Sequence, residues 1–222
     1  MLTQRVKKTI SFLSVRDMNA ETVLAWAAFN GHIDIVRSLI AKGVDVNARD
    51  SDGRGNSALM CAVQAGDLPM VRLLIKNGAD TNVGNSNWTP LMTAAWTMGS
   101  STRRNKKDIL VILKLLLAKG AKVNARDRVG QTALSLAAAV CDVSTLRVLL
   151  RAGAYLNTRD KRGNGALIGA VQHCNCDTLK FLLKQGINAN ARNKEGQTVL
   201  AYAEECKAAE MVELLVQHGA RK

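Results

Sequence analysis

The chain of 222 residues lacks the segments on which several classes of protein depend. No apolar run reaches the roughly 18 residues that span a bilayer, and the longest candidate, 109–117, is interrupted by Lys114. The basic start, 1–8, is followed by neither a hydrophobic stretch nor a small-residue cleavage site, which argues against a secretory signal. The five cysteines are odd in number and have no framework spacing, so we expect a reducing compartment, the cytoplasm.

Patterns that carry catalysis are also missing. The sequence has three histidines and no Gly-rich phosphate loop, HExxH pair or nucleophile elbow, while its carboxylates are dispersed. We therefore expect no enzymatic activity and no cofactor. A metal site would have to gather His173, Cys174, Cys176 and Cys206, but no second paired-cysteine motif accompanies them. We expect small, partly buried cysteines there and no bound metal.

What the chain does contain is one spacing, written six times. A Leu is followed by a Gly nineteen residues later, or twenty-nine in the third pair, where ten residues are inserted. The last three pairs recur at a period of 33. A fixed period of this length predicts a solenoid in which each unit contacts only its neighbours. The pairs are Leu24/Gly43, Leu59/Gly78, Leu91/Gly120, Leu134/Gly153, Leu167/Gly186 and Leu200/Gly219.

Each unit reads as two helices joined by a tight turn. The apolar residues of both stretches have helical rather than alternating spacing. The repeated Gly suits the left-handed residue that follows a helix, and a short Asn-Ala-Arg-Asp segment with another Gly then predicts a projecting turn. A hydroxyl residue stands where it can accept from the first N–H groups of the first helix. These residues are Thr22, Thr89, Thr132 and Thr198.

These units resemble the ankyrin repeat over about nine-tenths of the chain. The residues that carry the resemblance are the helix opening Thr89–Met92, which reads TPLM, and the finger opening Gly43–Ala48, which reads GVDVNA. The His that customarily follows the motif Leu is absent, and Cys141 and Cys174 replace the Gly between the two helices. The resemblance implies an all-α solenoid of stacked helix-turn-helix units with projecting hairpin-like finger loops. It also implies a non-catalytic module that binds other proteins.

The period divides the chain into a short segment and six repeats. Residues 1–20 resemble an N-terminal capping half-repeat, and exposed glutamates on the last helices would suit a terminal cap. We expect a monomer. The six repeats occupy approximately 21–50, 51–85, 86–127 with a basic insertion at 99–108, 128–160, 161–193 and 194–222.

The net charge of +13 is concentrated in the middle of the chain. Residues 101–200 hold 18 Lys or Arg against 6 Asp or Glu, whereas the remainder is nearly balanced. One basic group recurs at the finger turns, where stacking would place it in a row along one rim and create a field that attracts an acidic partner. Its members are Arg126, Arg128, Arg159, Lys161, Arg162, Arg192 and Lys194.

A second basic group lies in the insertion of the third repeat. Ser and Gly beside four cations predict an exposed loop between the two helices of that repeat. Its contact with something acidic is one interpretation, and a simple solvated insertion is the other. The four cations are Arg103, Arg104, Lys106 and Lys107.

In ankyrin proteins the fingers and the exposed side of each first helix form the binding groove. Aromatics make up only 4% of the chain, yet three of them fall at groove positions, where they would serve as interface anchors. The competing interpretation is that Trp96 covers the core beside the insertion. The positions that the resemblance assigns to the groove, besides the finger cations, are Phe29, Asn30, Gln64, Trp88, Trp96, Gln172 and His173.

Together these features predict a protein-interaction module that grips an acidic segment of another protein with its finger and inner-helix face. The alternative is a basic solenoid that binds nucleic acid, since a sequence pI near 9.9 fits a phosphate track. Against it, the sequence shows no helix-turn-helix, zinc finger or single-strand stacking platform.

Overall fold

The structure is a computed structural model that describes residues 20–50, 55–85, 87–98, 105–140, 142–173 and 175–221. The predicted N-terminal half-repeat at 1–20 therefore lies almost wholly outside the described residues. The chain divides into two compact units, which are described separately. The described residues of the first run to Ala94 and from 105 to Ala121; those of the second are 95–98 and everything from Lys122 onward.

The first unit is built from helical hairpins. α2 packs on α3 and α4 packs on α5, and neighbouring hairpins join through α2 and α4 and through α5 and α7. The helices are α2 (Ala20–Phe29), α3 (Ile33–Ala41), α4 (Ala58–Ala65), α5 (Leu68–Lys76), α6 (Pro90–Thr97) and α7 (Lys106–Ala118), with the last residues of α6 grouped in the second unit.

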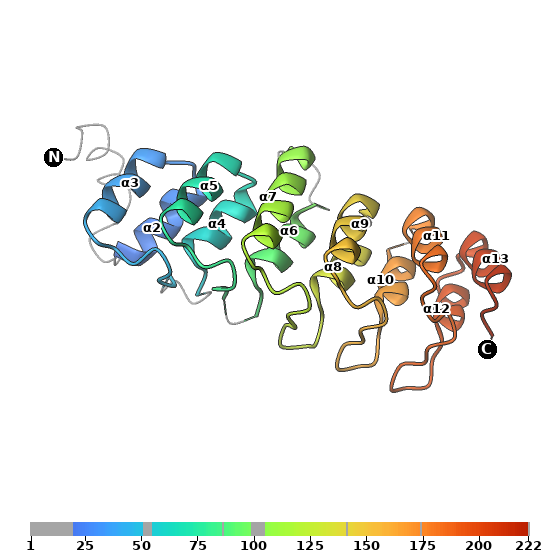
Figure 1. Ribbon diagram of the computed structural model, residues 1–222. Helices are drawn as coiled ribbons and strands as arrows, with labels where there is room; N and C mark the ends of the chain where they lie inside the picture. Colours follow the sequence, from blue (N-terminus) through green and yellow to red (C-terminus); the bar gives the residue numbers. More distant parts are fainter. Residues whose placement is uncertain are drawn as a thin grey trace. The chain divides into compact units, whose positions relative to one another are not determined.

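The second unit repeats the same arrangement three times. The first helices α8, α10 and α12 pack side by side, and the second helices α9, α11 and α13 cover them on one side. Figure 1 shows the connecting loops of this unit projecting together beyond the helices. The bounds are α8 (Ala133–Ala139), α9 (Val143–Arg151), α10 (Ala166–Gln172), α11 (Cys176–Lys184), α12 (Val199–Glu205) and α13 (Ala209–Gln217).

Helix ends follow the predicted chemistry with one exception. The Thr132 and Thr198 hydroxyls accept from backbone N–H groups three residues on, at 3.4 and 3.2 Å, and Thr89 does the same at 3.3 Å. Thr22 is different, since α2 already begins at Ala20 and Thr22 is buried within it. All six repeated glycines have φ between 78° and 88°, the left-handed region that a side chain disfavours. The glycine prediction is confirmed.

Small residues at the centre of the hairpins let the helices approach closely. Ala27, Ala28, Ala137 and Ala138 have no exposed surface. The loops between repeats are also joined, by asparagine. Asn124 Nδ2 donates to the Gly153 carbonyl at 3.0 Å, and Asn124 Oδ1 accepts from the Tyr155 backbone N–H at 2.9 Å. This pairing fixes the spacing of successive loops.

Candidate interaction surface

Three fingers project from the second unit: 126–131, 159–164 and 192–197. Each is closed by a backbone hydrogen bond of 2.9 Å, for example from Asp160 N–H to the Asn164 carbonyl. A side-chain oxygen at the same place accepts from two backbone N–H groups of the turn, as Asp160 Oδ1 does from Arg162 and Asn164 at 2.8 Å. Asp127 and Asn193 repeat this pattern. The finger aspartates therefore shape the turn as well as offsetting charge.

The fingers are stacked on one another through their backbones. Lys161 N–H donates to the Val129 carbonyl at 2.7 Å, and Lys194 N–H donates to the Arg162 carbonyl at 2.8 Å. The approach is so close that a Cβ added at Gly163 would lie 2.9 Å from the Lys194 nitrogen. Three segments that are 33 residues apart in sequence thereby form one continuous edge.

An arginine ladder, made of Arg126, Arg159 and Arg192, runs through this edge. Arg126 Nη2 donates to the carbonyl oxygen of Arg159, and Arg159 Nη1 donates to the carbonyl oxygen of Arg192 at 2.8 Å. Arg192, in the last finger, donates instead to the carbonyl of Gly196 at 2.8 Å. These guanidinium groups hold the fingers together, a role that the sequence pattern does not reveal.

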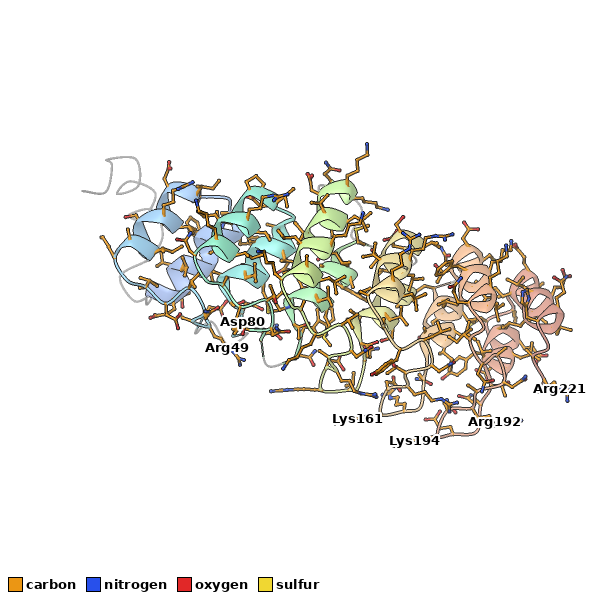
Figure 2. All side chains as sticks on the ribbon, in the orientation of Figure 1. Arg49, Asp80, Lys161, Arg192, Lys194 and Arg221 are labelled. Carbon is orange, nitrogen blue, oxygen red and sulfur yellow. The ribbon has the colours of Figure 1, made fainter. Side chains whose placement is uncertain are left out.

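The fingertip cluster consists of Lys161, Arg162 and Lys194. All three side chains are exposed. Figure 2 shows Lys161 and Lys194 on the projecting loops of the second unit. Arg128 is also exposed, next to Val129, whose side chain is 51% exposed. These four cations lie on successive fingers of this unit, while Arg126, Arg159 and Arg192 form the ladder.

The groove positions on the helices differ in exposure. Phe29 at the end of α2 and Trp96 on α6 are each 42% exposed, so Trp96 is not sealed in the core. Trp88 is half-buried, and its backbone N–H donates to Asn85 Oδ1 at 2.6 Å. Asn30 is exposed but its amide donates to the Trp26 carbonyl at 2.9 Å, which closes the end of α2. The other predicted groove positions, Gln64, Gln172 and His173, are exposed.

Two residues of the predicted loop in the third repeat, Lys106 and Lys107, are helical. Lys106 and Lys107 are the first residues of α7, because Asn105 accepts from the Lys107 N–H at 3.0 Å and begins the helix there. Both lysines are exposed. Arg103 and Arg104 lie outside the described residues.

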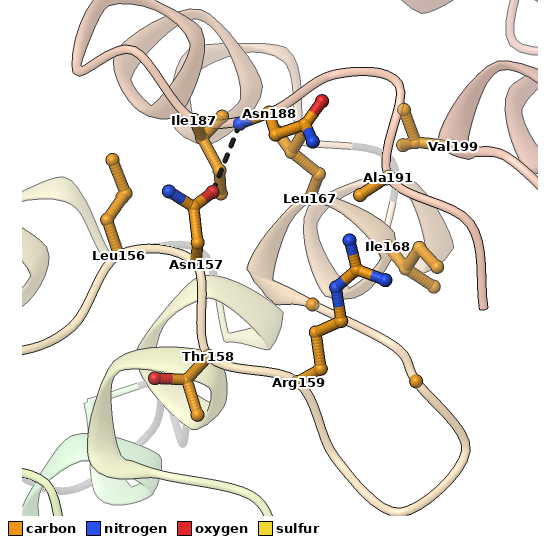
Figure 3. Close-up of a pocket in the computed structure, with 12 residues that line it drawn as sticks. Leu156, Asn157, Thr158, Arg159, Leu167, Ile168, Ile187, Asn188, Ala191 and Val199 are labelled. Carbon is orange, nitrogen blue, oxygen red and sulfur yellow. Dashed lines mark hydrogen bonds between the residues drawn. The ribbon is translucent and has the colours of Figure 1, made fainter. Parts of the chain in front are cut away.

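A small cavity of about 30 Å³ lies beneath the finger 159–164 (Figure 3). Gly165 lines it, at the position where the neighbouring repeats carry Thr132 and Thr198. Asn188 N–H donates to Asn157 Oδ1 at 3.1 Å across the adjoining loop, and Arg159 extends toward Ala191. The cavity is mostly apolar and has room for little more than a water molecule.

Tyr155 was not among the predicted site residues, yet its side chain is 69% exposed. It lines a shallow pocket with Arg126 and Arg159. The sequence does carry a signal for this residue. When the repeats are aligned, the equivalent loop position holds Asp, Lys, Asn or Arg in the other repeats and a tyrosine only here.

A family model described as ankyrin repeats (3 copies) matches residues 24–127 and 142–222. The chain therefore belongs to the ankyrin-repeat family, an all-α repeat solenoid. Members of this family generally bind other proteins and are typically non-catalytic. No curated protein matches the chain.

Two further findings concern metal ligands and membrane-spanning helices. Among the described residues, no three His, Cys, Asp or Glu side chains gather as metal ligands would. Over the same residues, no helix combines the length and the apolar character needed to cross a bilayer.

Proposed function

We propose that the second unit binds an acidic segment of another protein along its stacked fingers. The observation that carries this proposal is the fingertip cluster, because Lys161, Arg162 and Lys194 are exposed and the backbone of each is hydrogen-bonded to a neighbouring finger. Because the finger backbones are held in place, little backbone entropy is lost on binding, and together the cations steer an acidic partner toward the edge. Protein binding is also the general activity of the family.

Folding does not account for the fingertip cations. Their side chains take no part in the hydrogen bonds that close or stack the fingers, which use backbone groups, the finger Asp and Asn residues and the arginine ladder. Exposed ion pairs contribute little to stability in any case. Binding is the role that remains for a row of like charges, since like charges repel one another in the folded state.

The test compares two triple variants that lose the same charge. In the first, Lys161, Arg162 and Lys194 become Ser; in the control, the exposed outer-helix residues Arg37, Arg72 and Lys114 become Ser. The probe is a fluorescein-labelled oligoglutamate peptide, and stopped-flow anisotropy gives its association rate at several salt concentrations. We expect the fingertip variant to associate about tenfold more slowly at low salt and with a flatter salt dependence.

Equal slowing in both variants would mean that net charge, rather than the fingers, attracts the peptide, and the proposal would be wrong. Filter binding at low salt tests the nucleic-acid alternative. It would be favoured if the wild-type chain retained labelled DNA or RNA and the fingertip variant did not.

Apolar anchoring in the second unit is assigned to Trp96, which is exposed on α6; Phe29, exposed at the end of α2, lies in the first unit and would anchor a partner there independently. Truncation of an anchor removes contacts made in the complex and so raises the dissociation rate more than it lowers the association rate. Phe29→Ala and Trp96→Ala are therefore expected to speed dissociation of a captured partner. Gln64→Ala, also at an exposed groove position, is the control.

A further inference from the structure

The second unit has a loop pocket on Tyr155 that the proposed fingertip surface does not use. It has a volume of about 670 Å³ and is open to solvent. Its lining comes from the continuous stretch 155–159 and from Arg126 of the preceding finger. The residues that line it are Arg126, Tyr155, Leu156, Asn157, Thr158 and Arg159.

Tyr155 stands at a loop position where three of the six repeats carry a capping side chain. At the same loop position, Asp45, Asp80 and Asn188 each accept a hydrogen bond from the backbone N–H two residues on, at 2.9, 2.8 and 2.9 Å. A tyrosine ring cannot make this bond, and here it is largely exposed. Lys122 and Arg221, at the same position, cannot accept this bond either, so what distinguishes Tyr155 is a large aromatic ring that gains no burial, as expected of a side chain available for binding.

Two of the residues that line the pocket, Arg126 and Arg159, are held by the ladder. Arg126 donates to the carbonyl oxygen of Arg159, and Arg159 donates to that of Arg192 at 2.8 Å. A guanidinium has five N–H donors, so one such bond leaves others available. A carbonyl is neutral, and the positive charge is not cancelled. The two cations are thus held in place before any ligand arrives.

The charge along this loop position also changes between the two units. In the first unit it is acidic, with Asp45 and Asp80, whereas in the second it carries Lys122 and Arg221 on either side of Tyr155 and Asn188. Lys122, Tyr155 and Arg221 are all exposed. An anionic ligand would meet cations on both sides of the tyrosine, and no carboxylate at this position.

We propose that the loop pocket binds an acidic peptide segment in which an aromatic residue is flanked by Glu or Asp. The aromatic ring packs against Tyr155, and the neighbouring carboxylates pair with Arg126 and Arg159. Aromatic pairs and arginine–carboxylate forks are the contacts that these side chains form best. The proposal shares the acidic partner with the proposed function, but it rests on different side chains.

The experiment uses the full chain and three fluorescein-labelled peptides, Glu-Glu-Phe-Glu-Glu, Glu-Glu-Ala-Glu-Glu and Gln-Gln-Phe-Gln-Gln, with anisotropy as the readout. We expect the first peptide to bind about tenfold more tightly than either of the others, as one aromatic pair and a set of charge-assisted bonds imply. Tyr155→Asn should remove the preference for Phe over Ala. This variant should fold, because Asn188 occupies the same position in the next repeat.

The fingertip triple variant separates the two proposals. If it weakens all acidic peptides while Tyr155→Asn changes nothing, the loop pocket is wrong and the proposed function stands. If only Tyr155→Asn weakens binding, the pocket stands and the fingertip surface is wrong. Equal binding of the Gln peptide would overturn the pairing with Arg126 and Arg159. Backbone amide signals of Leu156 and Thr158 must shift during titration with the first peptide, and shifts confined to other residues would also overturn the proposal.

Discussion

Arg159 joins two fingers that are 33 residues apart in the sequence, because its Nη1 donates to the carbonyl oxygen of Arg192 at 2.8 Å. The corresponding arginine one repeat earlier, Arg126, makes the same contact with Arg159. One residue type at one repeat position therefore both stabilises the stack and contributes charge to its edge. Arg162, two residues after Asp160, is exposed and can be compared with Arg159 directly.

Replacement of Arg159 by Met is expected to lower the free energy of unfolding by about 1 kcal/mol, the usual worth of one exposed hydrogen bond. Met preserves much of the aliphatic stem and removes the donor. Arg162→Met loses the same charge without losing a ladder bond, and its effect should stay within about 0.5 kcal/mol. Urea denaturation followed by circular dichroism measures both. Equal losses would show that the ladder bond contributes nothing to stability.

The sequence predicted the repeat architecture because the fold depends on local and periodic features. Gly43 and its five counterparts are required by the backbone conformation after a helix, and Thr132 and Thr198 are required by helix caps. Such features are written within a few residues of one another. They were confirmed, apart from Thr22, which lies inside a helix whose start could not be located from the threonine alone.

The direction of each finger cation could not be predicted. Whether an arginine points to solvent or to the next finger depends on the distance between fingers, and this distance is set by contacts such as Lys194 N–H to the Arg162 carbonyl. Tyr155 was missed for a different reason, because its signal is a departure from the residues at the equivalent loop positions and shows only when the repeats are aligned. Lys106 was assigned to a loop because the capping role of Asn105 was overlooked.

Gly163 is expected to be far less tolerant of substitution than Gly196. Both have positive φ, 84° and 80°, so Ala costs about 1–2 kcal/mol of backbone strain at either position. Only at Gly163 does the added Cβ also meet the next finger, 2.9 Å from the Lys194 nitrogen, whereas nothing lies within 4 Å at Gly196. Gly163→Ala should therefore cost roughly 1–3 kcal/mol more than Gly196→Ala.

Thermal unfolding of the two alanine variants gives this difference. A matching loss at both positions would mean that the fingers can separate without a free-energy cost, and that their stacking does not hold the fingertip cluster in place.

Gly165→Thr should stabilise the protein by about 1 kcal/mol. Gly165 begins α10 with φ −108° and ψ −179°, an extended conformation that Thr adopts, and its side-chain cap is missing. An added Cβ meets only the Thr158 carbonyl oxygen, at an ordinary 3.6 Å. Thr supplies the hydroxyl cap seen at Thr132 and reduces the freedom of the unfolded chain.

Gly165→Val is the matched control, since it has the same shape and backbone stiffness without the hydroxyl. Thr should exceed Val in melting temperature by the contribution of the cap. A Val variant as stable as the Thr variant would show that the gain comes from the backbone and the cavity alone.

Cys176 should react slowly with alkylating reagents because its surroundings favour the thiol over the thiolate. Burial raises its pKa, and the hydrogen bond and negative charge of Glu210 raise it further. In turn, the pKa of Glu210 is lowered by the hydrogen bond from Cys176 and by Lys180, whose Nζ lies 3.2 Å from Glu210 Oε1. At neutral pH Glu210 is therefore ionised and keeps Cys176 protonated.

Glu210→Gln removes this charge, so the pKa of Cys176 falls and more thiolate is present at a given pH. Alkylation by iodoacetamide should become about twofold faster or more, since the thiolate is the reactive form. The gain should be largest below the pKa of the wild-type thiol and should vanish above it, where both proteins are fully ionised. Glu213→Gln, an equal loss of charge on another exposed residue of α13, should leave the rate unchanged. Peptide mass mapping resolves Cys176 from the other cysteines, and a rate unaffected by Glu210→Gln would contradict the contact between the α11 thiol and the α13 carboxylate.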